Sequence, residues 1–229
     1  MDNISLFFLI LFAVVSILHI IGEFTIDLKN KRNTILNSIT KLLIIPSLLV
    51  FYIISVISIY PFIVSALVSG FLGDLFLLLQ RIYRKERFFY LGLGSFGLGH
   101  IFYTSNFIIL SSFHDFRCYS IFLTFPFLLA GITIAKILLS HIEKKKEKIS
   151  VVIYILLTVI LGIGSSLLLA SSYLTGELLI YIGTIFFAIS DGMNGYCRFV
   201  KQIKYKETII MSTYIVAQFL IIYNIIKIV

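Results

Sequence analysis

Two aspartates could do acid–base chemistry, because each interrupts a long apolar stretch at the same distance from a basic residue. Asp74 lies seven residues before Arg81, and Asp191 lies seven residues before Arg198. At 1.5 Å per helical residue, each carboxyl group is expected roughly 10 Å inside the apolar layer. Asn194 shares the helix face of Asp191 at i+3. An acid at the centre of a membrane span costs about 2.5–3.5 kcal/mol and usually marks function, so the aspartates are a candidate catalytic pair.

Further polar residues are expected at similar depths. The same count of residues places Lys41 and Tyr214 in one layer with the aspartates, and His100 and Gln218 in a second layer nearer the midplane. Structural alternatives stay open for all four. Lys41 could snorkel to the interface or lock the bundle as an ion pair, and the others could be interhelical hydrogen-bond partners.

A metal site is a weaker interpretation of these residues. His100 together with the two aspartates would be a hydrolytic zinc set. The expected depth of His100, about 9 Å beyond the acids, argues against it, so neither a metal nor another cofactor is expected. His19 and Glu23, at i and i+4, are expected to form an interfacial pair.

The elements that must position these residues are membrane-spanning helices. Of the 229 residues, 59% are hydrophobic and 13% are charged, which excludes a water-soluble globular domain and a disordered chain. Eight apolar stretches can each cross the hydrocarbon core as a helix. They leave no room for a soluble domain, so residues 1–229 are expected to form a single membrane-embedded domain, an all-α polytopic bundle of eight transmembrane helices. The predicted spans are 4–22, 36–57, 60–80, 88–110, 118–140, 150–170, 178–197 and 208–226.

The distribution of basic residues predicts the orientation. Fifteen of the 19 lysines and arginines, including Lys31 and Arg32, fall in the first, third, fifth and seventh linkers. The positive-inside rule then places these linkers in the cytoplasm and both termini outside. The net charge of +8 therefore indicates a membrane surface and no nucleic-acid partner. We expect a multi-pass protein of the cell membrane, the cytoplasmic membrane in a bacterium. Cys118 and Cys197 are predicted on opposite sides, which argues against a disulfide.

A weak internal repeat relates the two halves of the chain. Gly73-Asp74 is matched by Ser190-Asp191, and His100 is matched by Gln218, at offsets of 117 to 118 residues. This spacing predicts two four-helix halves in parallel orientation, as in some other membrane folds.

Several motifs in this order resemble the YhhN/TMEM86 family of integral membrane proteins, over residues from about 36 to 226. The motifs are Phe71-Leu72-Gly73-Asp74-Leu75, Gly97 through Tyr103, and Gly183 through Ser190-Asp191 to Arg198-Phe199, with support from Thr40-Lys41 and from Tyr214 through Gln218 to Ile221. Characterised members are lysoplasmalogenases, which hydrolyse the vinyl ether bond of lysoplasmalogens to a fatty aldehyde and a glycerophospho-alcohol. The resemblance implies catalytic roles for Asp74 and Asp191. The residues expected to bind substrate or support the site are Lys41, His100, Tyr103, Tyr214, Gln218, Asn194 and Ser190.

Vinyl ether hydrolysis suits an acid pair. The carbon is protonated first, and water then attacks an oxocarbenium ion, so one acid and one stabilising carboxylate are needed, as in glycosidases. Burial favours a neutral acid and a nearby cation favours a carboxylate, which can divide the roles of two acids. We expect Asp191 to be the acid and Asp74 to pair with Lys41.

The expected partners are a lysophospholipid substrate and membrane lipids, with the oligomeric state open. The basic linkers, Arg84 and Lys85 among them, are expected to attract the phosphate. A different class of function stays open: a small lipid or ion transporter, or a lipid-binding protein, that uses the same polar layer as a relay. A structural membrane subunit is a third interpretation.

Overall fold

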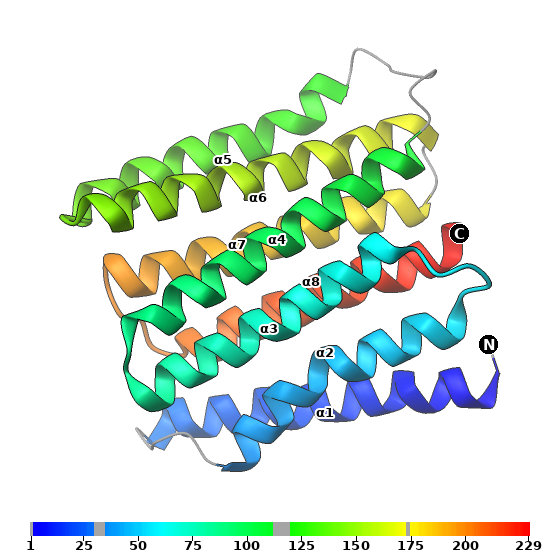
Figure 1. Ribbon diagram of the computed structural model, residues 1–229, viewed down its shortest axis with the longest axis horizontal. Helices are drawn as coiled ribbons and strands as arrows, with labels where there is room; N and C mark the ends of the chain where they lie inside the picture. Colours follow the sequence, from blue (N-terminus) through cyan, green and yellow to red (C-terminus); the bar gives the residue numbers. More distant parts are fainter. Residues whose placement is uncertain (1, 30–34, 112–119, 173–174) are drawn as a thin grey trace.

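The computed structural model describes residues 2–29, 35–111, 120–172 and 175–229, and within these ranges the chain forms eight α-helices and no strand. All eight helices are long and apolar enough to cross a membrane, which confirms the predicted all-α polytopic bundle (Figure 1). The helices are α1 (Asn3–Lys29), α2 (Ile35–Ser55), α3 (Pro61–Tyr83), α4 (Glu86–Leu110), α5 (Ser120–His141), α6 (Lys145–Ser172), α7 (Thr175–Phe199) and α8 (Lys206–Ile228).

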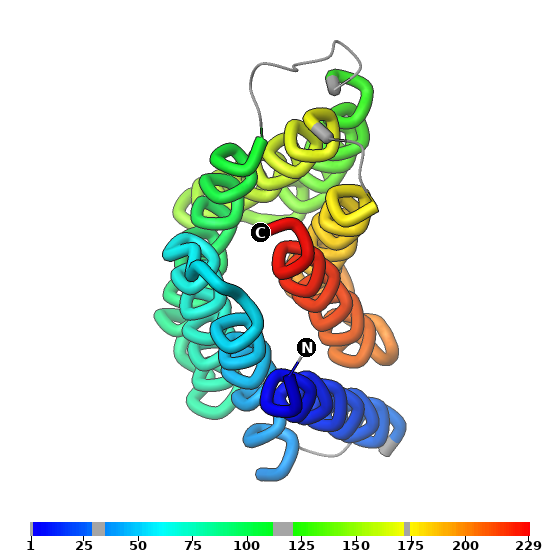
Figure 2. The backbone as a smooth tube through the Cα atoms, turned by 90° about the vertical axis from the view of Figure 1, so that its right-hand side faces the viewer, coloured from blue at the N-terminus to red at the C-terminus, as the bar shows by residue number. Residues whose placement is uncertain are grey.

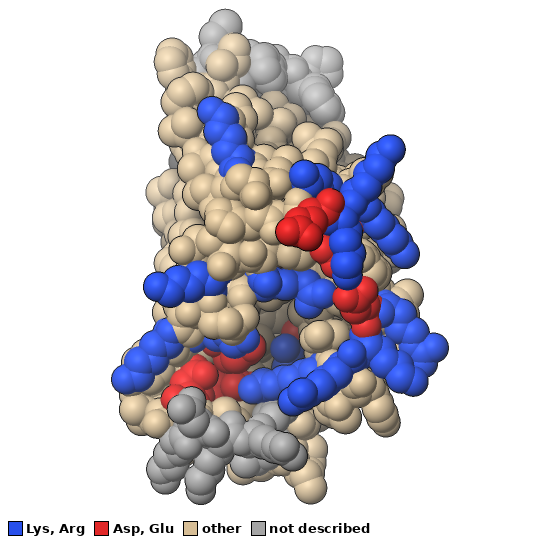
Figure 3. Space-filling view, turned by 90° about the vertical axis from the view of Figure 1, so that its left-hand side faces the viewer, with Lys and Arg blue, Asp and Glu red and all other residues tan. Residues whose placement is uncertain are grey.

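The helices alternate in direction, so the α1–α2, α3–α4, α5–α6 and α7–α8 connections share one end of the bundle and both termini lie at the other (Figure 1). Lysine and arginine side chains gather over the connection end, which is hollowed and shows acidic and basic atoms inside (Figure 3). We call it the basic end. It is the side that the positive-inside rule assigns to the cytoplasm. Lys31, Arg32 and Cys118 lie outside the described residues.

Packing among α2, α3 and α4 is repeated among α6, α7 and α8, as the weak repeat predicted, whereas the first helices of the halves differ: α1 contacts α8 and α5 contacts α7. Helix α2 packs on α3 and α8, and α6 packs correspondingly on α7 and α4. The α3–α4 and α7–α8 hairpins each close on a glycine: a Cβ at Gly99 would lie 3.4 Å from the Ala66 carbonyl oxygen, and one at Gly183 would lie 3.2 Å from that of Ala217. Ala66 and Gly183 are 117 residues apart, and Gly99 and Ala217 are 118 apart. The same close approach therefore recurs in both halves, with α8 enclosed by α1, α2 and α7 (Figure 2).

The largest difference from the predicted spans is at α1. The first span was expected to end at residue 22, but the helix continues to Lys29. Two acidic residues of this last part, Glu23 and Asp27, have partners on other helices. Glu23 accepts a hydrogen bond of 3.0 Å from Arg81, and Asp27 accepts one of 3.0 Å from Thr208.

Two helix boundaries at the basic end use left-handed backbone. Arg84 ends α3 with φ 53°, and its backbone N–H donates to the carbonyl oxygen of Gln80. Tyr205 precedes α8 with φ 61°. Glycine is the residue that usually occupies such positions, so both side chains are held there against a local preference.

Candidate active site

A cavity of about 900 Å³ leads from the basic end to both aspartates. Its walls come from α1, α2, α3, α4, α6, α7, α8 and the α3–α4 and α7–α8 connections. Six of the nine predicted site residues line it: Lys41, Asp74, Ser190, Asp191, Asn194 and Tyr214. The four residues expected in one layer, Lys41, Tyr214 and the two aspartates, therefore all line the same cavity.

Asp74 is buried on α3, with 3% of its surface exposed. The Nζ atom of Lys41 lies 3.5 Å from Asp74 Oδ1, so Lys41 points to the acid and does not snorkel away. Asp74 Oδ2 makes no hydrogen bond of ordinary geometry with any described residue. Gly73 brings α4 close, since a Cβ there would be 2.6 Å from the ring of Phe96. Asp74 thus has Lys41 as its charged partner and the Tyr214 hydroxyl as a polar neighbour at the cavity wall.

Asp191, on α7, has a different set of partners. The Tyr154 hydroxyl donates to its Oδ1 at 2.9 Å. The Thr158 hydroxyl lies 3.5 Å from its Oδ2 and 3.1 Å from the Tyr154 carbonyl oxygen, so its single proton is shared between these two acceptors. His100 Nε2 lies 3.4 Å from Oδ2. The imidazole itself is fixed between two aromatic rings, with ring centroids 5.3 Å from Tyr154 and 5.0 Å from Phe187. Asp191 is therefore surrounded by hydroxyl groups and an imidazole. Asp74, in contrast, lies beside the ammonium group of Lys41.

The predicted separation between His100 and the acids is wrong. A gap of about 9 Å was expected from residue counts, yet His100 is in contact with Asp191. The count assumed that side chains leave the helix at right angles, but a Cα–Cβ bond tilts toward the helix N-terminus. Helices α4 and α7 run in opposite directions, so His100 leans toward the basic end and Asp191 leans away from it. The two tilts close the gap.

Tyr154 and Thr158 were missed by sequence reasoning, because a tyrosine and a threonine in an apolar stretch carry no sign of function by themselves. The internal repeat could have indicated Thr158. Thr158 lies 117 residues after Lys41, the same offset that relates Asp74 to Asp191. The ammonium partner of one aspartate thus corresponds to a hydroxyl partner of the other.

Tyr103 and Gln218 form a pair behind the cavity wall. The Tyr103 hydroxyl donates to Gln218 Oε1 at 2.6 Å, and both side chains are almost fully buried. The Tyr214 hydroxyl and Gln218 Nε2 face Gly70, where a Cβ would lie 3.2 and 3.5 Å from them. Ser190 donates to the Ile210 carbonyl oxygen at 3.0 Å, which ties α7 to α8. These contacts position Tyr214, whose hydroxyl interacts with the Asp74 carboxyl, and they hold α7 against α8 beside Asp191.

A second, apolar pocket of about 80 Å³ meets the cavity at Asp191. It lies among α3, α4, α5, α6 and α7, and Gly131, Tyr154 and Gly192 contribute to its walls. The residues that line both spaces are Leu77, Phe89, Phe96, Asp191, Asn194 and Phe199. Asp191 and Asn194 therefore stand at the boundary between a polar space and an apolar one.

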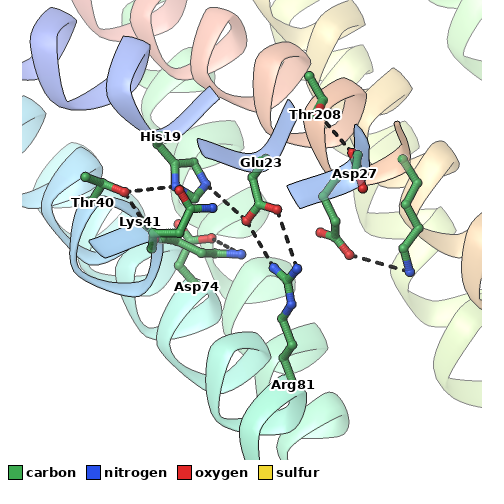
Figure 4. A network of polar contacts seen from close by, with 11 residues as sticks. His19, Glu23, Asp27, Thr40, Lys41, Asp74, Arg81 and Thr208 are labelled. Atoms are coloured by element: carbon green, nitrogen blue, oxygen red, sulfur yellow. Dashed lines mark hydrogen bonds and ion pairs between the residues drawn. The ribbon is translucent and has the colours of Figure 1, made fainter. Parts of the chain in front are cut away.

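A buried ion network supports the α1 side of the cavity (Figure 4). Glu23 is 1% exposed and lies 3.0 Å from Arg81 and 3.9 Å from His19 Nε2. His19 Nδ1 is 3.1 Å from the Thr40 hydroxyl, next to Lys41 in the chain. The expected His19–Glu23 pair exists, and both side chains are buried inside the bundle. The network holds the helices that carry Lys41 and Asp74.

The described residues contain no group of three or more His, Cys, Asp or Glu side chains arranged to hold a metal ion. The groups at the cavity wall supply two carboxyls in different surroundings, with space for water beside them. This arrangement can protonate a substrate at one point and stabilise positive charge at another.

Eight membrane-length helices around a cavity with two buried aspartates define a multi-pass membrane protein with an internal polar site. The chain belongs to the YhhN family: the sequence model of that family matches residues 36–225, from α2 to α8. This confirms the resemblance in the motifs, and membership fits a membrane protein of lysoplasmalogenase type. Comparison with curated proteins and with solved structures gives no match for this chain.

Proposed function

We propose that this protein is a membrane hydrolase that cleaves the vinyl ether bond of lysoplasmalogens, or of a related lysolipid ether. Water is consumed, and a fatty aldehyde and a glycerophospho-alcohol are released. The observation that carries the proposal is the position of Asp191, which lines both the polar cavity and the apolar pocket, while Asp74 lines the same cavity. A lysolipid has this same division, with a polar head group, one apolar chain and the ether oxygen at their junction.

The two aspartates take different roles in this proposal. Asp191 donates a proton to the vinyl carbon that does not carry oxygen, which converts the ether into an oxocarbenium ion. Asp74 acts as the carboxylate, because the neighbouring Lys41 favours its charged form; it stabilises that cation and orients water toward it. Water adds to the oxocarbenium carbon and its proton passes to the Asp191 carboxylate, which restores the acid. The hemiacetal then collapses: its hydroxyl proton moves to the departing ether oxygen, and aldehyde and alcohol are released. This sequence uses two carboxyls as glycosidases do.

The remaining residues of the site position these two acids. Tyr154 and Thr158 hold the carboxyl of Asp191, and the packed imidazole of His100 limits its rotation. Tyr214 and the Tyr103–Gln218 pair form the wall behind Asp74. The head group lies in the polar cavity, and the first carbons of the chain lie in the apolar pocket with the remainder among the helices and lipid.

The test is aldehyde release in detergent solution, where no gradient exists. Purified protein is given alkenyl lysophosphatidylethanolamine, and aldehyde is followed with a coupled dehydrogenase. Asp74→Asn and Asp191→Asn should each lower turnover by at least 100-fold. Asp27→Asn is the matched control, since Asp27 lines the cavity near its mouth and bonds to Thr208, and it should retain turnover.

Thermal melting of each variant separates loss of chemistry from loss of fold. Aldehyde from the wild type and from Asp27→Asn, but not from the two folded site variants, supports the proposal. Full turnover in a folded Asp191→Asn protein contradicts it. Absence of aldehyde from the folded wild type directs attention to transport, which is then measured in liposomes with two compartments.

A further inference from the structure

Most cations in the cavity wall already have an acidic partner. Five lysine or arginine residues line the cavity. Three of them are within 3.5 Å of a carboxylate oxygen: Lys41 with Asp74, Arg81 with Glu23, and Lys206 with Glu207. The other two, Arg84 and Arg198, form no ion pair with a described residue. Neither arginine therefore has a carboxylate at ion-pair distance within the described ranges, although Glu147 lines the same cavity and acts on Arg198 from farther away.

Packing holds the Arg198 side chain in position, but one of its hydrogen-bond donors has no partner in the part of the chain that the structure describes. Its guanidinium carbon lies 3.5 Å from the centre of the Phe89 ring, and its Nε atom is buried with no hydrogen-bond partner among the described residues. Burial of an unpaired donor is costly, and a bound anion would remove that cost. The planar guanidinium suits phosphate because it donates two parallel hydrogen bonds.

Arg84 is placed at the same cavity by an unusual backbone. Its φ of 53° is a conformation that glycine adopts more readily than arginine. Residues held in such conformations are concentrated at functional sites. Lys85, the next residue, begins the turn into α4 and is not part of the described cavity wall. Of the two residues expected to attract the phosphate, only Arg84 is among the residues that line the cavity.

We infer that Arg84 and Arg198 bind the phosphate of the lysolipid head group, an inference that rests on the proposed function. Arg198 follows Asp191 by seven residues on one helix, which is roughly 10 Å along the axis at 1.5 Å per residue. In a lysoplasmalogen, six single bonds of about 1.5 Å separate the oxygen-bearing vinyl carbon from phosphorus. When extended, these six bonds cover most of the distance from Asp191 to the guanidinium of Arg198. The phosphate oxygens, which extend beyond phosphorus, cover the remainder.

Binding of an uncleavable analogue tests the inference without requiring turnover. Detergent-solubilised protein is titrated with 1-O-alkyl lysophosphatidylethanolamine and with 1-O-alkylglycerol, which has the same chain and no phosphate. The wild type should bind the phospholipid at least tenfold more tightly. Arg198→Gln and Arg84→Gln should each weaken phospholipid binding about tenfold, the loss expected for one charge-assisted hydrogen bond, and leave alkylglycerol binding unchanged.

Lys85→Gln is the matched control, because it removes one positive charge from the adjacent residue and should change neither affinity. Arg198→Lys keeps the charge without the planar fork and should fall between the wild type and Arg198→Gln. Glycerol 3-phosphate as competitor separates the two sources of phosphate: the lipid assignment requires it to compete far more weakly than the analogue.

Equal wild-type affinity for the two lipids overturns the inference, as does an unchanged affinity in folded Arg198→Gln. Competition by glycerol 3-phosphate at the concentration of the analogue overturns the assignment to a lipid head group. Selective binding of the phospholipid without hydrolysis of the vinyl ether would leave the phosphate site intact and reject the reaction instead, so the two failures are distinguishable.

Discussion

Removal of the Tyr154 hydroxyl tests the division of roles between the two acids. The hydroxyl donates to Asp191 Oδ1 at 2.9 Å, and the ring packs against His100. Tyr154→Phe keeps the ring and deletes only the donor. If Asp191 gives up its proton in the transition state, its carboxyl becomes charged, and the bond from Tyr154 strengthens just then.

The magnitude follows from the difference between neutral and charged acceptors. A hydrogen bond to a charged group contributes about 1.5–3 kcal/mol, against about 0.5–1.5 kcal/mol for a neutral pair. The hydrogen bond from Tyr154 is therefore stronger by roughly 1.4 kcal/mol when Asp191 is charged than when it is neutral. Without it the activation barrier rises by this amount, which lowers the rate about tenfold. Only interactions that are stronger in the transition state affect kcat, so kcat should fall about tenfold with little change in KM.

The assay is steady-state aldehyde release, with Tyr181→Phe as the matched control. The Tyr181 hydroxyl donates to the Leu123 carbonyl oxygen at 2.9 Å, and Tyr181 is buried outside both cavities. This control should cost about 1 kcal/mol of stability and leave kcat unchanged. A folded Tyr154→Phe protein with the kcat of the wild type, or one in which only KM changes, would refute the assignment of Asp191 as the proton donor.

Three further substitutions test other parts of the structure. Gly192→Leu places a side chain in the apolar pocket, and should shift the preference toward shorter alkenyl chains in a chain-length series, whereas an unchanged profile would remove the pocket from the substrate path. Arg84→Gly relieves left-handed backbone and should raise the stability by about 0.5–1 kcal/mol while it weakens binding of the phospholipid analogue. Tyr205→Gly relieves the same backbone conformation away from the cavity, so a matching loss of lipid affinity there would contradict the reasoning. Glu23→Gln leaves Arg81 without its buried partner and should lower the free energy of unfolding by about 3 kcal/mol. This is the lower end of the range for a buried pair, because Arg81 is partly exposed. The loss is measured as a lower melting temperature.

The topology was predictable from the sequence because its signals are averages over many residues. Each span needs about 20 apolar residues, and the alternation of basic linkers depends on 15 side chains, so no single position decides the outcome. The acid pair was predictable for the opposite reason, since Asp74 and Asp191 stand alone in apolar surroundings. A charged residue inside a membrane span is energetically costly, so it is rare and easily recognised in the sequence.

Contacts between helices were less predictable, because they depend on directions that residue counts do not contain. The contact of His100 with Asp191 requires two antiparallel helices whose side chains lean toward each other. Glu23 looked like an interfacial acid, and only the packing of α1 against the bundle buries it beside Arg81. Tyr154 could not be distinguished from the other tyrosines until α6 was placed against α7.

The repeat explains how two similar halves can support unlike acids. Equivalent helix packing presents an aspartate at the cavity from each half, on α3 and on α7. The preceding helix differs at both positions that contact Asp191, because Tyr154 and Thr158 in the second half correspond to Asn37 and Lys41 in the first. An ammonium beside one carboxyl, and hydroxyls with an imidazole beside the other, give the two acids different electrostatic surroundings. A difference in function between the halves thus requires few substitutions on a shared backbone.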